Sequence, residues 1–482
     1  MRAWDRSRAR RLRAIVALGL TVVMSAPSTT AARAAHAPAP KPALPIASQP
    51  KAAGGSISAY DLIELQIAYT TLLAVYYKPI EPRTLVVGAR RAIAAEIAAR
   101  GVRDLVLPAV PASIDRDRGS DLVDTFVLQS LARARARLDG HRLVTAAVAG
   151  ELASLHDPYT VAFVPQQFKK FNAYLGNASF GGVGAIVTLD PSGTSARVER
   201  ALPDGPGYAA GLRDNDTIVA IDSRTIAQIG TAHLRDALRG RVGTTVRLDL
   251  RRGDERVALA IVRATVRDPE VRSALLGEIG YVELTRFGDR AGRELGAAVA
   301  ALRGRGARAF VLDLRGNGGG YGDEATAVAA IFMGGPIFIT RDRTGVPRIA
   351  RATMTTPFPE RLAILVDGDT ASAAEIVAGA LQDAGRATIV GEKTFGKGLV
   401  QSVFPLPDGS ALKITTARYT TPKGRDIDHI GIVPDVPVAS AAATVRGNPA
   451  TDVQLARAIE VLGAGTATPE ASSPSPNPSA SM

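Results

Sequence analysis

The feature that most constrains the fold is an alternation of strand-type and helix-type patterns that begins after Gly277. Short apolar runs alternate there with longer segments of helical period, and this alternation is typical of helices packed on a sheet. A β-hairpin is expected to follow over Leu399–Thr421, around Pro407-Asp408-Gly409. We therefore predict an α/β layer with an added hairpin. Its expected elements are strand Gly280–Leu284, helix Ala291–Arg303, strand Ala309–Leu314, helix Glu324–Phe332, strand Leu362–Val366, helix Ser372–Ala384 and strand Ala387–Val390.

Two other patterns precede this layer. Ala, Leu, Val and Ile recur at helical spacing from Ala59 to about Leu155, which predicts a helical N-terminal region over residues 56–170. Residues 175–268 instead show short β-type runs interrupted by one helix, Thr231–Leu238, and predict a compact β-rich module. The fold class is thus α+β, with several domains. The expected strands of the module are Ala185–Leu189, Ala196–Arg200, Thr217–Ile221, Val246–Leu250 and Val257–Val262.

The first 34 residues have the three-part layout of a secretory signal peptide. A basic run from Arg6 to Arg13 precedes the apolar stretch Ala14–Met24, and small residues end in Ala32-Arg33-Ala34. We expect export to the periplasm or cell envelope, while an uncleaved N-terminal membrane anchor shares the same features. Residues 35–55 are expected to be a disordered linker.

Composition excludes several classes of function. The chain contains no cysteine, so disulfides, thiol nucleophiles and cysteine-bound metals are ruled out. The formal net charge is +12, but seven basic residues and one acidic residue lie in the first 34, which leaves about +6 for the rest. No basic block is interleaved with aromatic residues, so nucleic-acid binding is not indicated.

A serine stands where a strand gives way to a helix, in Asp369-Thr370-Ala371-Ser372-Ala373-Ala374-Glu375. Unpaired backbone N–H groups and the positive end of the helix dipole gather at a helix N-terminus, and they can stabilise an oxyanion there. Ser372 is therefore a candidate nucleophile, with the Ala373 N–H as an oxyanion donor. The alternative is a serine that only caps the helix.

A lysine follows one strand later in Thr394-Phe395-Gly396-Lys397-Gly398. Lysine can take the proton of a serine hydroxyl only if loss of solvent keeps it neutral, and apolar neighbours would provide that. The alternative is a surface charge in a turn. The chain has five histidines, but none has metal-ligand spacing and no G-x-S-x-G motif exists, so a Ser-His-Asp triad is the weaker assignment.

These motifs together resemble the C-terminal processing peptidases, also called tail-specific proteases. The resemblance covers about residues 140–440 and includes Asp157-Pro158-Tyr159-Thr160, residues 313–320 (DLRGNGGG), residues 370–376 (TASAAEI) and residues 390–398 (VGEKTFGKG) with Gln401. It implies that Ser372 is the nucleophile, Lys397 the general base and Gln401 the residue that orients the lysine. It also points to the Gly318 N–H as the second oxyanion donor.

The family pattern often has a second serine at position 374, where this chain has Ala374. Glu375 is expected to cap the first turn of the helix, and Asp383 to accept hydrogen bonds in its last turn. Neither carboxylate is assigned to catalysis.

The β-rich module resembles a PDZ domain. Phe180-Gly181-Gly182-Val183-Gly184 is similar to its carboxylate-binding loop, and residues 209–218 (AAGLRDNDTI) are similar to its helix-turn-strand signature, with Asn215 where glycine is more usual. Such a domain binds an extended C-terminus as an added strand. The expected division is therefore signal peptide 1–34, linker 35–55, helical region 56–170, PDZ domain 175–268, peptidase core 269–445, and a C-terminal helix with a disordered tail over 446–482.

The sequence thus predicts an exported serine endopeptidase that acts on proteins or peptides with free, apolar C-termini and needs no metal or organic cofactor. The alternative is a non-catalytic PDZ-like scaffold that binds the tails of envelope proteins. Whether the chain forms a homo-oligomer or works with an adaptor stays open.

Overall fold

A computed structural model describes residues 22–25, 57–134, 137–176, 180–190, 192–202, 205–230, 233–266, 269–353, 357–441 and 446–464. Residues 170–269 form one compact unit, and the parts of the chain before and after them form another. The predicted linker 35–55, the C-terminal tail and most of the predicted signal peptide lie outside the described residues. No helix within the described ranges is long and apolar enough to span a membrane.

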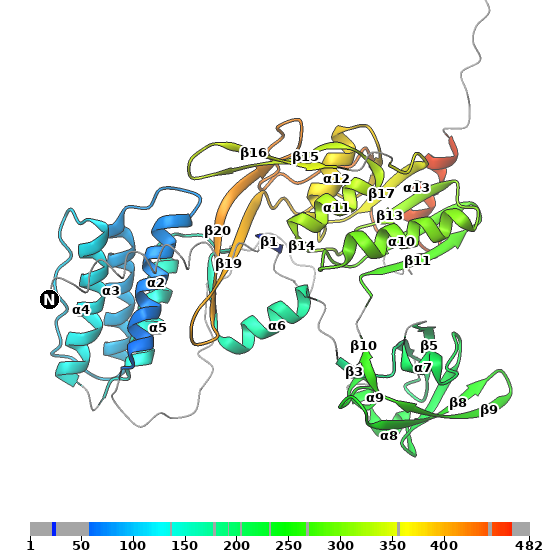
Figure 1. Cartoon of the computed structure of the whole chain (residues 1–482), viewed down its shortest axis with the longest axis horizontal. Coiled ribbons are helices and arrows are strands. Elements are labelled where there is room, and N and C mark those ends of the chain that lie inside the picture. The colour runs from blue at the N-terminus through cyan, green and yellow to red at the C-terminus, as the bar shows by residue number, and fades with distance from the viewer. Residues whose placement is uncertain are drawn as a thin grey trace, which may run out of the picture. The chain divides into compact units, whose positions relative to one another are not determined.

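A six-stranded sheet forms the centre of the larger unit (Figure 1). Five of its strands are parallel, and the edge strand β11 is antiparallel to β12. The predicted alternation of strands and helices is confirmed over this region. In spatial order the strands are β11 (Val271–Leu276), β12 (Ile279–Leu284), β13 (Ala309–Asp313), β17 (Arg361–Val366), β18 (Thr388–Gly391) and β21 (Val436–Pro437).

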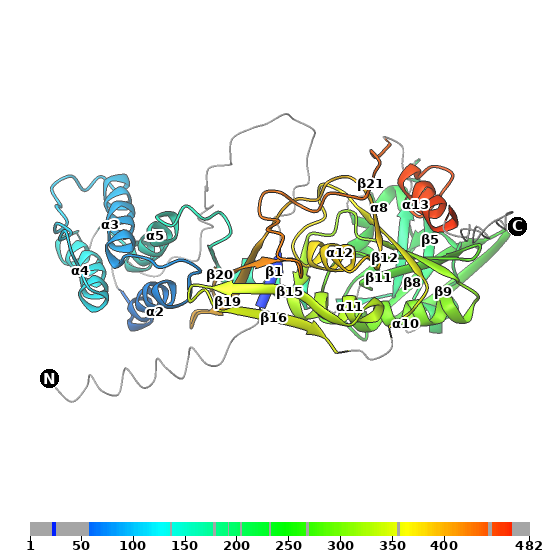
Figure 2. The same cartoon turned by 90° about the horizontal axis from the view of Figure 1, so that it is seen from above.

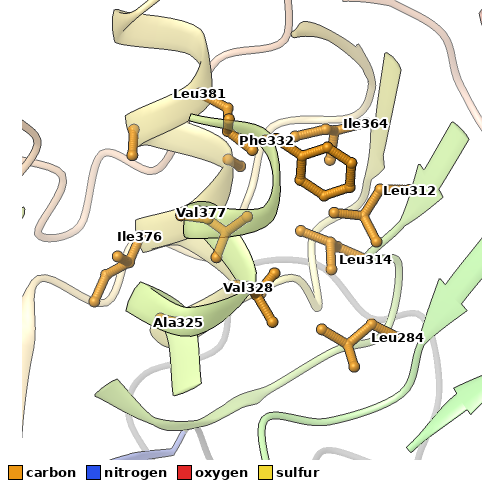
Figure 3. Close-up of a cluster of buried hydrophobic side chains, with 14 of the residues drawn as sticks. Leu284, Leu312, Leu314, Ala325, Val328, Phe332, Ile364, Ile376, Val377 and Leu381 are labelled. Atoms are coloured by element: carbon orange, nitrogen blue, oxygen red, sulfur yellow. The ribbon is translucent and has the colours of Figure 1, made fainter. Parts of the chain in front are cut away.

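Helices cover both faces of this sheet. Helices α10 (Ala291–Gly304), α11 (Gly322–Phe332) and α12 (Ala373–Asp383) bury one apolar face, and α13 (Val453–Ala464) packs on the other. Burial on both faces explains why the strands are nearly continuous apolar runs. Figure 3 shows side chains of the two helices beside side chains of the sheet: Val328 and Phe332 of α11, Val377 and Leu381 of α12, Leu312 of β13 and Ile364 of β17.

A second sheet lies beside α12 and includes the predicted hairpin, formed by β19 (Leu399–Pro405) and β20 (Ala411–Thr420). A further hairpin, β15 (Gly335–Asp342) and β16 (Pro347–Ala352), was not predicted and extends the sheet from β20 (Figure 2). The short strand β2 (Val161–Phe163) also pairs with β20. At the other side, β1 (Val22–Ser25) lies between β14 (Gly319–Tyr321) and β19.

The helical region contains α2 (Ala59–Val75), α3 (Pro82–Ala99), α4 (Arg116–Ala134) and α5 (Gly140–Ala153), and α6 (Pro165–Leu175) follows. The first four helices share one apolar core. Leu412 and Ile414 of β20 are buried in the same core, so the hairpin packs against the helices.

The smaller unit has a sheet whose main path follows the order β4-β5-β6-β8-β9. Alternate residues of β8 are buried, as expected for a sheet with one face on a core. Strand β4 is an edge of this sheet, which leaves backbone groups available for a further strand. The elements are β3 (Phe180–Gly182), β4 (Ala185–Leu189), β5 (Ala196–Ala201), α7 (Pro206–Ala209), β6 (Thr217–Ile221), β7 (Arg224–Thr225), α8 (Ile226–Ile229), α9 (Leu234–Leu238), β8 (Thr245–Arg252), β9 (Glu255–Val262) and β10 (Ala264–Val266).

Candidate active site

Ser372 lies immediately before α12, in the turn that follows the carboxyl end of the central strand β17. Its side chain is fully buried, and its backbone has φ +60° and ψ −117°. A residue other than glycine with positive φ is strained, and such strain is concentrated at functional sites. Ser372 and Glu375 have the arrangement of a capping box, but among the described residues no hydrogen bond to Ser372 Oγ is formed. The hydroxyl is therefore not committed to a structural bond, as a pure helix cap would be.

The glycine loop after β13 is held against this turn. The Ala371 N–H donates to the Asn317 carbonyl at 2.9 Å, and the Gly319 N–H donates to Asn317 Oδ1 at 2.9 Å. A Cβ atom on Gly319 would lie 2.9 Å from the Ala373 nitrogen, so the two segments touch. The Gly319 amide is already bonded within the loop. The Gly318 N–H, which the resemblance implies as the second oxyanion donor beside Ala373, stays a prediction.

Lys397 lies in the loop between β18 and β19 and is also fully buried. Its Nζ atom has no hydrogen-bond partner in the described part of the chain and lies 4.9 Å from the centroid of the Tyr159 ring. Burial lowers the pKa of Lys397 well below its ordinary value of 10.5, and the nearby charge of Lys413 lowers it further. The surroundings therefore favour a neutral amine, which can accept a proton.

One carboxylate joins the two segments. Glu375 Oε2 accepts the Ser372 N–H at 2.8 Å and the Lys397 N–H at 2.9 Å. Glu375 Oε1 accepts the Gly396 N–H at 2.7 Å and the Thr394 hydroxyl at 2.6 Å. Burial raises the pKa of Glu375, while these four hydrogen bonds oppose the rise. The sequence predicted the helix cap, but not that the same carboxylate also holds the lysine loop.

Gln401 is buried on β19, and its Nε2 donates to Thr415 Oγ1 at 3.4 Å. Neither Gln401 Oε1 nor Lys397 Nζ has a partner among the described residues, so the bond expected between them is absent from this arrangement. The Thr415 N–H donates to Thr160 Oγ1 at 3.0 Å, and this hydroxyl donates to Asp157 Oδ2 at 2.7 Å. The turn at residues 157–160 thus supports Gln401 through Thr415.

The support from this turn and from Tyr159 was missed at the level of the sequence. Its only signal was the motif Asp157-Pro158-Tyr159-Thr160, which gives no indication of a partner 255 residues away. Lys413 was also missed. It lies on β20, with its Nζ 5.6 Å from the centroid of the Phe163 ring, and burial lowers its pKa to about 8.

A buried ionic network fixes the start of the glycine loop. The Arg315 guanidinium donates to both carboxylate oxygens of Asp313, at 3.0 and 2.6 Å, and to both of Asp452, at 2.9 and 2.6 Å. It also donates to Gln454 at 2.9 Å, and the Tyr281 hydroxyl donates to Asp313 at 2.7 Å. Bidentate pairing of this kind is geometrically specific. The segment at α13 therefore helps to position the loop that contains Gly318.

The candidate peptide-binding segment lies in the smaller unit. Phe180, Gly181 and Gly182, the first residues of the segment that resembles a carboxylate-binding loop, form strand β3, which pairs with β10. Gly184 has φ +70°, and its ideal Cβ would lie 2.8 Å from Gly205, so the chain turns here in a way that requires glycine. Val183 and Gly184 lead directly into the edge strand β4. This edge is where an extended peptide could be added.

Comparison with known proteins gives a family match for each of two parts of the chain. Residues 278–438 match Peptidase family S41, and residues 197–252 match the PDZ domain. A carboxyl-terminal-processing protease of Picosynechococcus sp. is 36% identical over 325 residues, which are 66% of this chain and 78% of that protein. These matches define the class as a serine peptidase that contains a PDZ domain.

Further relatives have the same description. Carboxyl-terminal-processing peptidase 2 of Arabidopsis thaliana is 38% identical, over 60% of this chain and 59% of the relative. A solved structure, the photosystem II D1 C-terminal processing protease, is 26% identical with a TM-score of 0.44 and covers 80% of this chain and 94% of its own. The chain belongs to the carboxyl-terminal processing protease family, and the predicted family and α+β multidomain fold class are confirmed.

Proposed function

We propose that this chain is an exported endopeptidase that selects proteins by their C-terminal ends and cleaves them with Ser372 as nucleophile and Lys397 as general base. The observation that supports this pair most directly is the shared carboxylate oxygen of Glu375. The backbone nitrogens of Ser372 and Lys397 both lie within 2.9 Å of that atom. The two backbone segments that bear these buried side chains are therefore adjacent.

The proposed chemistry proceeds in two halves. Neutral Lys397 takes the hydroxyl proton as Ser372 Oγ attacks the scissile carbonyl carbon, and the Ala373 and Gly318 N–H groups stabilise the resulting oxyanion. Lys397 then gives the proton to the leaving amine, which leaves an acyl-enzyme. In the second half Lys397 takes a proton from water, the hydroxide attacks the ester, and the proton returns to Ser372 Oγ.

The proposed recognition of C-termini rests on the smaller unit and on the activity named for the relatives. A substrate tail would pair with edge strand β4, with its carboxylate at the Val183–Gly184 turn and its apolar last side chain turned toward the core of the smaller unit. Export to the periplasm or cell envelope rests on the N-terminal sequence pattern. Retention of that N-terminus would anchor the chain to the membrane.

The first experiment compares cleavage of an unfolded protein that ends in apolar residues with cleavage of the same protein amidated at its C-terminus. Wild-type chain is expected to cut the free-ended form faster, and Ser372→Ala is expected to cut neither while folding normally by circular dichroism. Equal cleavage of both forms would contradict C-terminal selection. If the folded wild-type chain binds the tail but does not cleave it, the peptidase hypothesis is wrong and the non-catalytic scaffold hypothesis is favoured.

The second buried lysine predicts a pH effect. The positive charge of Lys413 lowers the pKa of Lys397. The substitution Lys413→Met should therefore raise the pKa of Lys397. If neutral Lys397 is the base, activity is lost as pH falls through its pKa, and the acidic limb of the kcat/KM profile should move to higher pH in the variant. Lys423→Met, at a different position of the same unit, should leave the limb in place. An unchanged limb in Lys413→Met would contradict the assignment of Lys397 as the titrating base.

A further inference from the structure

Three side chains with metal-binding groups lie together outside the active site, where helices α2 and α5 begin. One ligand atom each from Asp61, Glu64 and His141 lies within 4.8 Å of the other two. Asp61 and Glu64 are three residues apart on α2 and therefore share a face, and His141 lies in the first turn of α5. His141 Nδ1 is 2.9 Å from Asp61 Oδ1. Sequence spacing gave no sign of the cluster because its members come from two separate helices.

The helix start explains Asp61 but not Glu64. Asp61 Oδ2 accepts hydrogen bonds from the Ser58 N–H and hydroxyl at 2.8 and 2.7 Å, which is an ordinary capping box. Glu64 is one turn further on, is only 6% exposed, and its Oε1 has no hydrogen-bond partner among the residues described. A buried carboxyl oxygen without a partner costs free energy, so it calls for a ligand.

A fourth carboxyl group faces the cluster from the turn of the β19–β20 hairpin. Asp408 shares a side-chain hydrogen bond with Glu64. A cation bound among these carboxyl groups would balance their combined negative charge. His141, whose side chain is 50% exposed, leaves the site open to solvent for entry of an ion.

We propose that Asp61, Glu64 and His141 bind one zinc-type divalent cation, with Asp408 beside it at the hairpin turn. Imidazole with carboxylate ligands suits zinc, whereas calcium and magnesium prefer oxygen ligands alone. Zinc bonds of about 2.0–2.2 Å place ligand atoms about 3.3 Å apart, so only small side-chain movements are needed from the present arrangement. The ion would fasten α2 to α5 next to the turn of the hairpin whose first strand contains Gln401.

The test is titration of Zn²⁺ by calorimetry into tag-free, full-length Ser372→Ala chain that has been dialysed against EDTA, because this variant should not digest itself. We expect one Zn²⁺ per chain and a rise in melting temperature on binding. Glu64→Gln and His141→Gln, each added to Ser372→Ala, should weaken binding at least about tenfold. His233→Gln, an exposed histidine of the smaller unit, is the matched control and should not change the affinity.

The proposal is overturned if Zn²⁺ does not bind, or if it binds with the same affinity after both cluster substitutions. Ca²⁺ binding that His141→Gln leaves unchanged would likewise contradict it. His141 is half exposed and should tolerate substitution, so failure of Glu64→Gln to fold would still leave the His141→Gln comparison decisive.

Discussion

Lys397→Met is expected to abolish cleavage while raising the melting temperature of the chain. Methionine fills a similar volume but cannot accept a proton, so loss of the general base should reduce kcat by about 10⁴-fold. The wild-type amine is buried and has no hydrogen-bond partner among the described residues, and such a group costs about 1–3 kcal/mol, which methionine would recover. Steady-state kinetics and thermal unfolding measure the two effects.

Lys393→Met is the matched control, because Lys393 is exposed in the segment just before Lys397. It should retain activity and show no gain in stability. Substantial cleavage by Lys397→Met would exclude this lysine as the base. A lower melting temperature would instead show that the amine has a structural partner.

Glu375→Gln should damage both activity and stability, although it changes only one functional group. The wild-type carboxylate accepts four hydrogen bonds, whereas an amide has one acceptor oxygen and presents its own N–H groups to some of the same donors. Leaving buried donors unpaired should lower the free energy of unfolding by about 3 kcal/mol. Displacement of the Ser372 and Lys397 backbones should reduce kcat by about 10²-fold.

Asp383→Asn serves as the control on the same helix. Asp383 accepts the Lys423 N–H at 2.8 Å and pairs with Arg425 at 2.6 Å, as the sequence predicted for a structural acceptor. Its loss should lower stability but leave kcat unchanged. If Glu375→Gln lowers stability but leaves kcat unchanged, as expected for this control, the Glu375 carboxylate does not position the reacting groups.

The order of the larger unit's central elements was predictable because its strands are buried on both faces and its helices have clear apolar stripes. The β15–β16 hairpin was missed, since β16 is largely exposed and includes Pro347, Arg348 and Arg351, which do not form an apolar run. Helix α6 (Pro165–Leu175) continues past residue 170, where the predicted helical region ended. For the β15–β16 hairpin, pairing with β20 and not local pattern decides the structure.

In the candidate site, too, some features were predictable from local sequence and others depend on tertiary contacts. Ser372 and Lys397 could be proposed from local context, because a helix start and a glycine-flanked lysine have a chemical meaning on their own. The supporting contacts could not, since Glu375 meets its partners 19–22 residues later and Thr160 meets Thr415 from 255 residues away. The spacing of residues along the sequence contains no information about such long-range contacts.

The Arg315 network has a consequence for the timing of activity during synthesis. The ribosome produces Ser372, Lys397 and the glycine loop well before it reaches Asp452 and Gln454, the acceptors that hold Arg315 from the other face of the sheet. Until those residues emerge, the guanidinium lacks three of its five hydrogen bonds, and the loop with the proposed second oxyanion donor is held only by contacts to earlier residues such as Leu284. The loop would therefore gain its last fixed contacts only once the late segment has docked, after the proposed nucleophile and base have already been made.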